Sequence, residues 1–126
     1  MDGTKTDPNY GLLDYWVVKT NSSGVKLWDR SIGGSGMEDL KTVGESSKGI
    51  YMIGGNSGSD IDGTRIQASR GGRDYYIAFL NSNGDILQDA AYGGSSDDQM
   101  TAMIQTSDGT YAVSYTHLTL PTILLV

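Results

Sequence analysis

The chain has 126 residues and a formal net charge of −6, with 18 glycines, 8 tyrosines, 2 prolines and no cysteine. The acidic balance argues against binding to nucleic acid or to an anionic membrane surface, because both require clustered cations. The absence of cysteine excludes disulfides, thiolate metal sites and cysteine nucleophiles.

The predicted elements are eight short strands, and no segment has helical periodicity of useful length. Asn-Ser-Ser-Gly at 21–24 and Asn-Ser-Asn-Gly at 81–84 predict hairpin turns. Residues 75–80 are apolar on both faces, which predicts an interior strand covered above and below. In chain order the predicted strands are 14–20, 25–32, 38–46, 50–55, 74–80, 85–92, 98–106 and 110–114.

The sequence repeats itself at a constant offset. Asp14-Tyr15-Trp16-Val17-Val18 aligns with Asp74-Tyr75-Tyr76-Ile77-Ala78, and the match continues without a gap to Tyr51 and Tyr111. A long period of this kind indicates stacked or radially arranged supersecondary units. We therefore predict an all-β fold of antiparallel four-stranded sheets, in which residues 38–92 form one complete sheet. The two strands left at each end pair with strands outside this stretch or with one another.

Five motifs mark the repeat and its insert: Asp-Tyr-Trp-Val-Val-Lys at 14–19, Trp28-Asp29, Gly-Gly-Ser-Gly-Met-Glu-Asp at 33–39, Gln-Ala-Ser-Arg-Gly-Gly at 67–72 and Gln-Thr-Ser-Asp-Gly-Thr-Tyr at 105–111. Together they resemble a glycine-rich, propeller-type repeat of large bacterial surface and secreted proteins, which often carry a type IX secretion sorting domain. The resemblance implies a partial β-propeller of about two blades. Because a closed propeller has at least four blades, neighbouring blades of the parent chain are expected partners.

This repeat divides the chain into four parts. Residues 1–13 are the end of a preceding inter-repeat insert, 14–73 are the first repeat with a polar insert at 56–73, 74–113 are a truncated second repeat, and 114–126 are a tail. No basic stretch followed by apolar residues opens the chain, so we expect a secreted parent to carry its signal outside these residues.

The tail departs from the repeat pattern. After Val113 the repeat calls for a glycine-rich close like Ile53-Gly54-Gly55, but the chain continues as Ser-Tyr-Thr-His-Leu-Thr-Leu-Pro-Thr-Ile-Leu-Leu-Val. This segment resembles a translated sequencing-adapter read-through, so we expect it to be non-native and to add nothing to the fold after about residue 114. The alternative is a natural edge strand, because edges tolerate proline.

The sequence offers no set of catalytic residues, which predicts a protein that is not an enzyme. His117 is the only histidine, no Gly-x-Ser-x-Gly motif occurs, and the glycine runs lack the Gly-Lys-Ser/Thr of a phosphate-binding loop. Glu38/Asp39 and Asp97/Asp98 recur at the same repeat position. A glycosidase needs one carboxylate pair rather than one pair per repeat, so turns or caps are the favoured interpretation.

Two loops contain candidate ligand-binding residues. Calcium is a weak candidate because hard oxygen ligands alternate along each of two segments, and an Asx-turn is the favoured alternative; these residues are Asp60, Asp62, Asn81, Asn83 and Asp85. Three arginines gather in the polar insert and suit a carboxylate or an anionic glycan, or else pair with nearby aspartates; they are Arg65, Arg70 and Arg73. Tyr15, Trp16, Tyr75 and Tyr76 could form a sugar platform, but their apolar strands favour the core.

The predicted function is a non-catalytic extracellular scaffold or binding module of a bacterial surface or secreted protein, with no cofactor. An extracellular protein or polysaccharide is the expected partner, and neither nucleic acid nor membrane insertion is expected. The alternatives are an accessory propeller domain of a secreted hydrolase and a purely structural spacer. Loops that project from a repeated scaffold are where binding usually resides, which directs attention to the polar insert.

Overall fold

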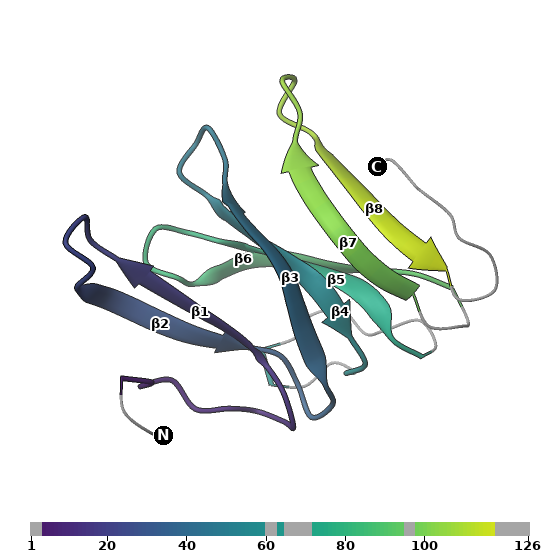
Figure 1. Cartoon of the computed structure of the whole chain (residues 1–126), viewed down its shortest axis with the longest axis horizontal. Coiled ribbons are helices and arrows are strands. Elements are labelled where there is room, and N and C mark those ends of the chain that lie inside the picture. The colour runs from purple at the N-terminus through teal and green to yellow at the C-terminus, as the bar shows by residue number, and fades with distance from the viewer. Residues whose placement is uncertain (1–3, 60–62, 65–71, 95–97, 118–126) are drawn as a thin grey trace.

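The computed structural model describes residues 4–59, 63–64, 72–94 and 98–117, and all the regular structure in these residues is β. The eight strands are β1 (Tyr15–Thr20), β2 (Lys26–Ile32), β3 (Glu38–Glu45), β4 (Tyr51–Ser57), β5 (Asp74–Leu80), β6 (Ile86–Tyr92), β7 (Asp98–Gln105) and β8 (Tyr111–His117). Every strand pair is antiparallel, which confirms the predicted fold class (Figure 1).

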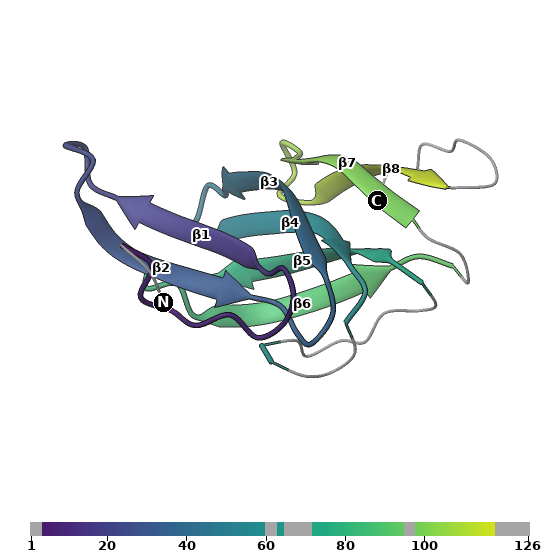
Figure 2. The same ribbon diagram turned by 60° about the horizontal axis from the view of Figure 1, so that its bottom comes forward.

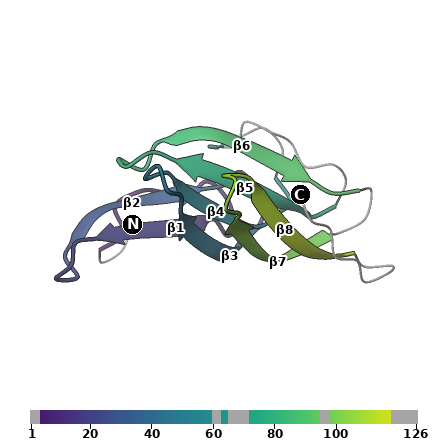
Figure 3. The same cartoon turned by 90° about the horizontal axis from the view of Figure 1, so that it is seen from above.

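The strands form one four-stranded sheet and two hairpins. The sheet has the order β3-β4-β5-β6, while β1 pairs with β2 and β7 pairs with β8. This confirms the prediction that residues 38–92 make one complete sheet. The strands at each end pair with one another, and the β1–β2 and β7–β8 hairpins lie on either side of the middle sheet (Figures 1 and 3).

Strand β5 is covered on both faces, as its unbroken apolar sequence predicts. One face of β5 contributes Tyr76, Ala78 and Leu80 to a core shared with Tyr15 and Val17 of β1. The opposite face contributes Tyr75 and Ile77 to a second core, whose other members are Met52, Met100, Met103 and Val113. Each hairpin therefore packs through its own core against the middle sheet. Figure 2 shows the hairpins as layers beside this sheet.

The strand register follows the sequence repeat. Tyr15 lies opposite Ile32 in the first hairpin, and Tyr75 lies opposite Tyr92 in the middle sheet. Register shifts also recur, after Lys19 and after Phe79. The tight turns use glycines with positive φ at aligned places, with values of 81° at Gly24 and 85° at Gly84, a conformation that suits glycine. We call this agreement the repeat correspondence, and two residues that it relates are counterparts.

Two predicted boundaries are wrong. Strand β4 continues through Asn56 and Ser57, which lie opposite Tyr75 and Asp74, and so extends past its predicted end at residue 55. Strand β8 continues to His117, which lies opposite Asp98. Pairing therefore extends beyond the end predicted for the fold at Ser114, because the backbone of a strand can pair whatever its side chains are.

Candidate interaction surface

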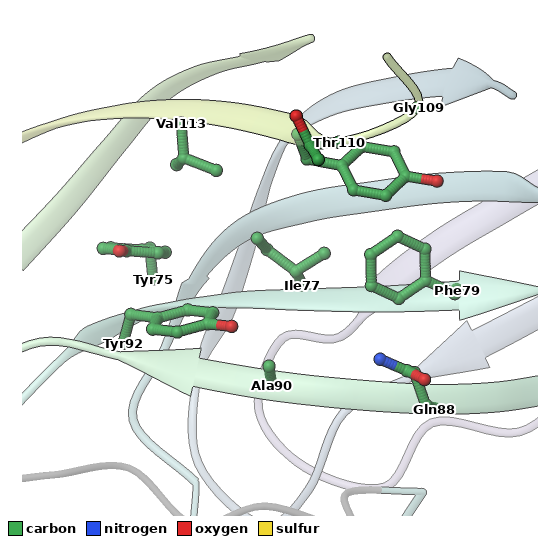
Figure 4. A pocket seen from close by; sticks show the side chains of 10 residues that line it. Tyr75, Ile77, Phe79, Gln88, Ala90, Tyr92, Gly109, Thr110 and Val113 are labelled. Atoms are coloured by element: carbon green, nitrogen blue, oxygen red, sulfur yellow. The ribbon is translucent and has the colours of Figure 1, made fainter. Parts of the chain in front are cut away.

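An apolar groove runs along β5 and β6, closed on one side by β8 and its preceding turn. Its volume is about 430 Å³, and Val113 points from β8 toward Tyr75 and Ile77 of β5 (Figure 4). We call it the β5–β6 groove. The described residues that line it are Tyr75, Ile77, Phe79, Gln88, Ala90, Tyr92, Gly109, Thr110, Tyr111 and Val113.

Aromatic side chains dominate the groove. The Tyr75 and Tyr92 rings stack with centroids 5.2 Å apart, and the Phe79 and Tyr111 rings lie 5.0 Å apart. No carboxylate, lysine, arginine or histidine is among the described lining residues. The groove is therefore suited to burying apolar surface.

The groove walls are the counterparts of the walls of the core between β1–β2 and the middle sheet. Tyr75 and Ile77 occupy the positions of Tyr15 and Val17, which are buried against β5. Val113 of β8 likewise occupies the position of Ile53 of β4, another member of that core. The corresponding pairs on β6 and at the start of β8 are Tyr92 with Ile32, Gln88 with Trp28, and Tyr111 with Tyr51. The groove thus matches a core wall whose covering strands are not among the described residues.

The edge of β8 matches an edge that is paired inside the chain. Strand β4 pairs on one side with β3 and on the other with β5, whereas β8, its counterpart, pairs with β7 alone among the described strands. Ile53 of β4 lies opposite Ala78 of β5. By the repeat correspondence, Val113 would face a strand bearing the equivalent of Ala78.

Neighbouring sheets are also joined through their turns. Trp28 Nε1 donates a hydrogen bond of 3.0 Å to the Ser82 carbonyl, and Arg30 donates one of 3.0 Å to the Asn83 carbonyl. The Lys19 ammonium lies 5.1 Å from the centre of the Tyr51 ring, a cation–π distance. The bonds from Trp28 and Arg30 hold the 81–84 turn against β2, and the Lys19–Tyr51 contact joins β1 to β4.

Residues 5–7 cross the outer face of the β1–β2 hairpin. The Thr6 N–H donates to Asp29 Oδ2 at 2.8 Å, and the Ser31 N–H donates to Asp7 Oδ2 at 2.7 Å. Burial alone would raise the pKa of Asp29. Hydrogen bonds from Thr6, Trp16 and Lys26 lower the pKa by more than burial raises it, so the pKa lies well below its ordinary value. Asp29 is therefore held as a buried carboxylate.

The predicted calcium ligands divide into two groups. Asp60 and Asp62 lie outside the described residues. In the 81–85 turn, the Asn81 side-chain oxygen accepts hydrogen bonds of 2.9 Å from the backbone N–H groups of Asn83 and Asp85. This is the Asx-turn geometry, in which the Asn81 oxygen serves the backbone. The described residues contain no group of three or more histidine, aspartate or glutamate side chains placed to hold a metal ion.

The predicted cationic site is described only in part. Arg65 and Arg70 lie outside the described residues, and Arg73 is half-buried directly before β5. The aromatic residues expected in the core divide as well. Tyr15, Tyr75 and Tyr76 are buried, whereas Trp16 is 43% exposed, so the expectation is wrong for Trp16.

The register relates the recurring carboxylates differently from the predicted pairs, of which Asp97 lies outside the described residues. Strand register relates Glu38 to Asp98, since Glu38 lies opposite Ser57 and Asp98 lies opposite His117. Glu38 is buried and accepts hydrogen bonds from the Ser57 hydroxyl at 2.8 Å, from the Gly34 N–H at 3.1 Å and from the Ser59 hydroxyl. Its oxygens are engaged in joining β3 to the end of β4, as the turn or cap interpretation predicts.

No known protein-family model matches the chain, and no curated protein matches it either. Within the described residues, no helix has the length and apolar character needed to cross a membrane. Sequence reasoning missed the groove. The sequence does contain a signal for it. Tyr75, Ile77 and Tyr111 occupy core positions of the second repeat, and the predicted sheet 38–92 leaves the last two strands, β7 and β8, outside it.

Proposed function

We propose that the chain is a non-catalytic repeat scaffold in which each sheet covers and completes its neighbour, as part of a β-propeller in a secreted or cell-surface bacterial protein. The observation that carries this proposal is the match between the β5–β6 groove and the closed core at the corresponding place in the preceding repeat. The resemblance of the Asp-Tyr-Trp-Val-Val-Lys and Gly-Gly-Ser motifs supports the extracellular setting.

Extending the chain by one outer hairpin tests the scaffold function. In this variant a second copy of residues 58–93 follows His117 and replaces residues 118–126, so that copies of β5 and β6 can pair with β8 and cover the groove. We expect a higher melting temperature and reduced solvent accessibility of Tyr92, because covering apolar side chains is favourable. A matched control appends the same segment with aspartate in place of the copies of Tyr76 and Ala78, the two residues of that face that pack on Tyr15 and Val17 within the chain. Equal melting temperatures for the extension and its control would overturn the proposal.

A binding role for the polar insert would make the scaffold a binding module for an extracellular protein or polysaccharide. Arg65, Arg70 and Arg73 support this finer proposal, because guanidinium groups recognise carboxylates. The test is a glycan array and a pull-down from cell-envelope extract, with the three arginines then replaced by serine. Binding that is unaffected by the replacements would leave the scaffold without this role.

A further inference from the structure

We propose that the chain associates head to tail with a second copy of itself, with the β1–β2 hairpin of one copy filling the β5–β6 groove of the next and β1 pairing with β8. The inference rests on the proposed scaffold function and names the partner. The association joins two open strand edges and two matching sheet faces. An equivalent edge pairing, β4 with β5, and an equivalent face packing, β1 on β5, already exist inside the chain.

The two open edges are complementary. Among the described residues, β1 pairs along its length only with β2, and β8 pairs only with β7. In the middle sheet their counterparts, β5 and β4, pair with each other through Ile53 and Ala78. The counterpart of Ile53 is Val113, and the counterpart of Ala78 is Val18. The same pairing between two copies would therefore set Val113 of one copy opposite Val18 of the next. Unpaired edges of this kind are templates for a further strand.

The exposed face of the hairpin matches the buried face of β5. Tyr76 and Ala78 are 0% exposed, because they pack against Tyr15 and Val17. Their counterparts on β1 are Trp16, 43% exposed, and Val18, 40% exposed. The counterparts of Tyr15 and Val17 are the groove residues Tyr75 and Ile77. Docking would therefore repeat a core that the chain already forms.

A second exposed residue agrees with the same arrangement. Val43 on β3 is 60% exposed, whereas Met103, its counterpart on β7, is 7% exposed and packs in the core against the middle sheet. Inside the chain, β7 packs against the middle sheet. In a head-to-tail pair, β3 of the second copy is the counterpart of β7 and would pack in the same way against β7–β8 of the first copy. Val43 would then be buried by the partner copy.

Residues 5–7 compete with docking for part of the hairpin face. They contact Asp29 and Ser31 on β2 and place the Lys5 ammonium 5.9 Å from the centre of the Trp16 ring. The docked copy must displace this segment, which reduces the net gain from association. Assembly is therefore expected to depend on protein concentration.

The contact is heterologous, so repeating it produces either a ring or an open filament. Each copy supplies strands equivalent to two four-stranded sheets. Because propellers have four to eight blades, closed rings would contain two to four copies. With a chain mass of 13.5 kDa, the expected ring masses are roughly 27 to 54 kDa.

Two matched substitutions test the interface in the full chain. Light scattering after size-exclusion chromatography, from about 10 µM to about 1 mM, should show the mass of the wild-type chain rising from 13.5 kDa toward the ring masses. Val18→Asp should keep the mass at 13.5 kDa. Val25→Asp should behave as wild type, because Val25 corresponds to Asp85, which is exposed within the chain. Both valines are already exposed, so neither change removes a core contact.

Engineered cysteines test the strand register. The chain has no native cysteine, so Val18→Cys with Val113→Cys should give disulfide-linked multimers on oxidation, reversed by reductant. Val25→Cys with Val113→Cys should give none. Wild-type protein that stays at 13.5 kDa without Val18–Val113 cross-links would overturn self-association, and so would equal cross-linking of the two cysteine pairs. If the extended chain is nevertheless stabilised, the scaffold function stands and the partner is different; if it is not, the scaffold function fails as well.

Discussion

The backbone N–H of Met100 in β7 donates a hydrogen bond of 2.6 Å to the side-chain oxygen of Asn56 in β4. The Asn56 carbonyl in turn lies 3.4 Å from the Tyr15 hydroxyl of β1. Asn56 is 2% exposed. One buried polar residue of the middle sheet therefore makes polar contacts with both flanking hairpins, in addition to the two apolar cores.

Replacing Asn56 with leucine should destabilise the fold. The change leaves the Met100 N–H buried without its acceptor, which costs about 1–3 kcal/mol of the free energy of unfolding. Urea denaturation followed by circular dichroism measures the change. Thr101→Val is the control, because its hydroxyl bonds Ser114 on an exposed surface and its loss should cost under about 0.5 kcal/mol. Equal effects of the two substitutions would contradict this role of Asn56.

Gly55→Ala should be strongly destabilising, because β3 approaches the backbone of β4 closely at this position. A Cβ at Gly55 would clash with the Asp39 carbonyl oxygen and lie 2.9 Å from the Leu40 Cα. Overpacking of this kind costs about 1–3 kcal/mol. Gly58→Ala is the matched control, since the nearest atom to a Cβ there is the Arg73 Cγ at 3.5 Å. Thermal unfolding should separate the two variants, and similar melting temperatures would show that β3 moves aside without cost.

Asp29 should make the fold sensitive to acid. Its pKa is lower in the folded chain than in the unfolded chain, so its stabilising contribution is complete above the ordinary value of 3.8 and is lost as the pH falls below it. Asp29→Asn should reduce stability at pH 7 by about 2 kcal/mol and flatten the loss of stability between about pH 4 and pH 2. The measurement is the melting temperature as a function of pH.

The control for this experiment is Asp39→Asn. Asp39 forms an ion pair of 2.7 Å with Lys41, and both side chains are substantially exposed. Surface pairs contribute little, so this variant should keep the acid sensitivity of the wild type. An unchanged pH profile in Asp29→Asn would show that other groups cause the acid sensitivity.

Two truncations should define the end of the fold. Ending the chain after His117 should leave the melting temperature unchanged and improve solubility, because it removes the apolar run Ile123-Leu124-Leu125-Val126. Ending it after Ser114 should lower the melting temperature, because Tyr115, Thr116 and His117 pair with β7. Differential scanning fluorimetry compares both with the full chain. A large loss of stability after the first truncation would show that residues 118–126 are part of the native fold.

The strands and their sheet could be predicted because their signals are local. Asn-Ser-Asn-Gly before Asp85 predicts a turn, and the apolar run 75–80 predicts a strand covered on both faces. The end of β4 could not be predicted in this way, because Asn56 and Ser57 are polar. Their burial depends on partners far away in the chain, Met100 and Glu38, that a local pattern does not contain.

The candidate surface was harder to predict than the fold. Tyr75 and Ile77 have the sequence signature of core residues, and they are indeed buried members of the second core. Tyr15 and Val17 have the same signature, and all four side chains are buried. A groove lies beside Tyr75 and Ile77 because of which strands neighbour them, and a local pattern does not contain that information. The arginine site was predicted from charge alone. Of its three arginines, the structure describes only Arg73.

The middle sheet takes β3 and β4 from the first sequence unit and β5 and β6 from the second. The boundary between sequence units therefore lies between β4 and β5, in the middle of a sheet, and the boundaries between sheets lie between β2 and β3 and between β6 and β7. A recombination crossover after Arg73 would divide this sheet between two parents, separating the partners Ile53 and Ala78. A crossover in the glycine-rich segment 33–37 would exchange whole sheets and preserve every pairing within them. Genetic exchange among proteins of this architecture should therefore favour breakpoints at the Gly-Gly-Ser segments over breakpoints in the polar insert.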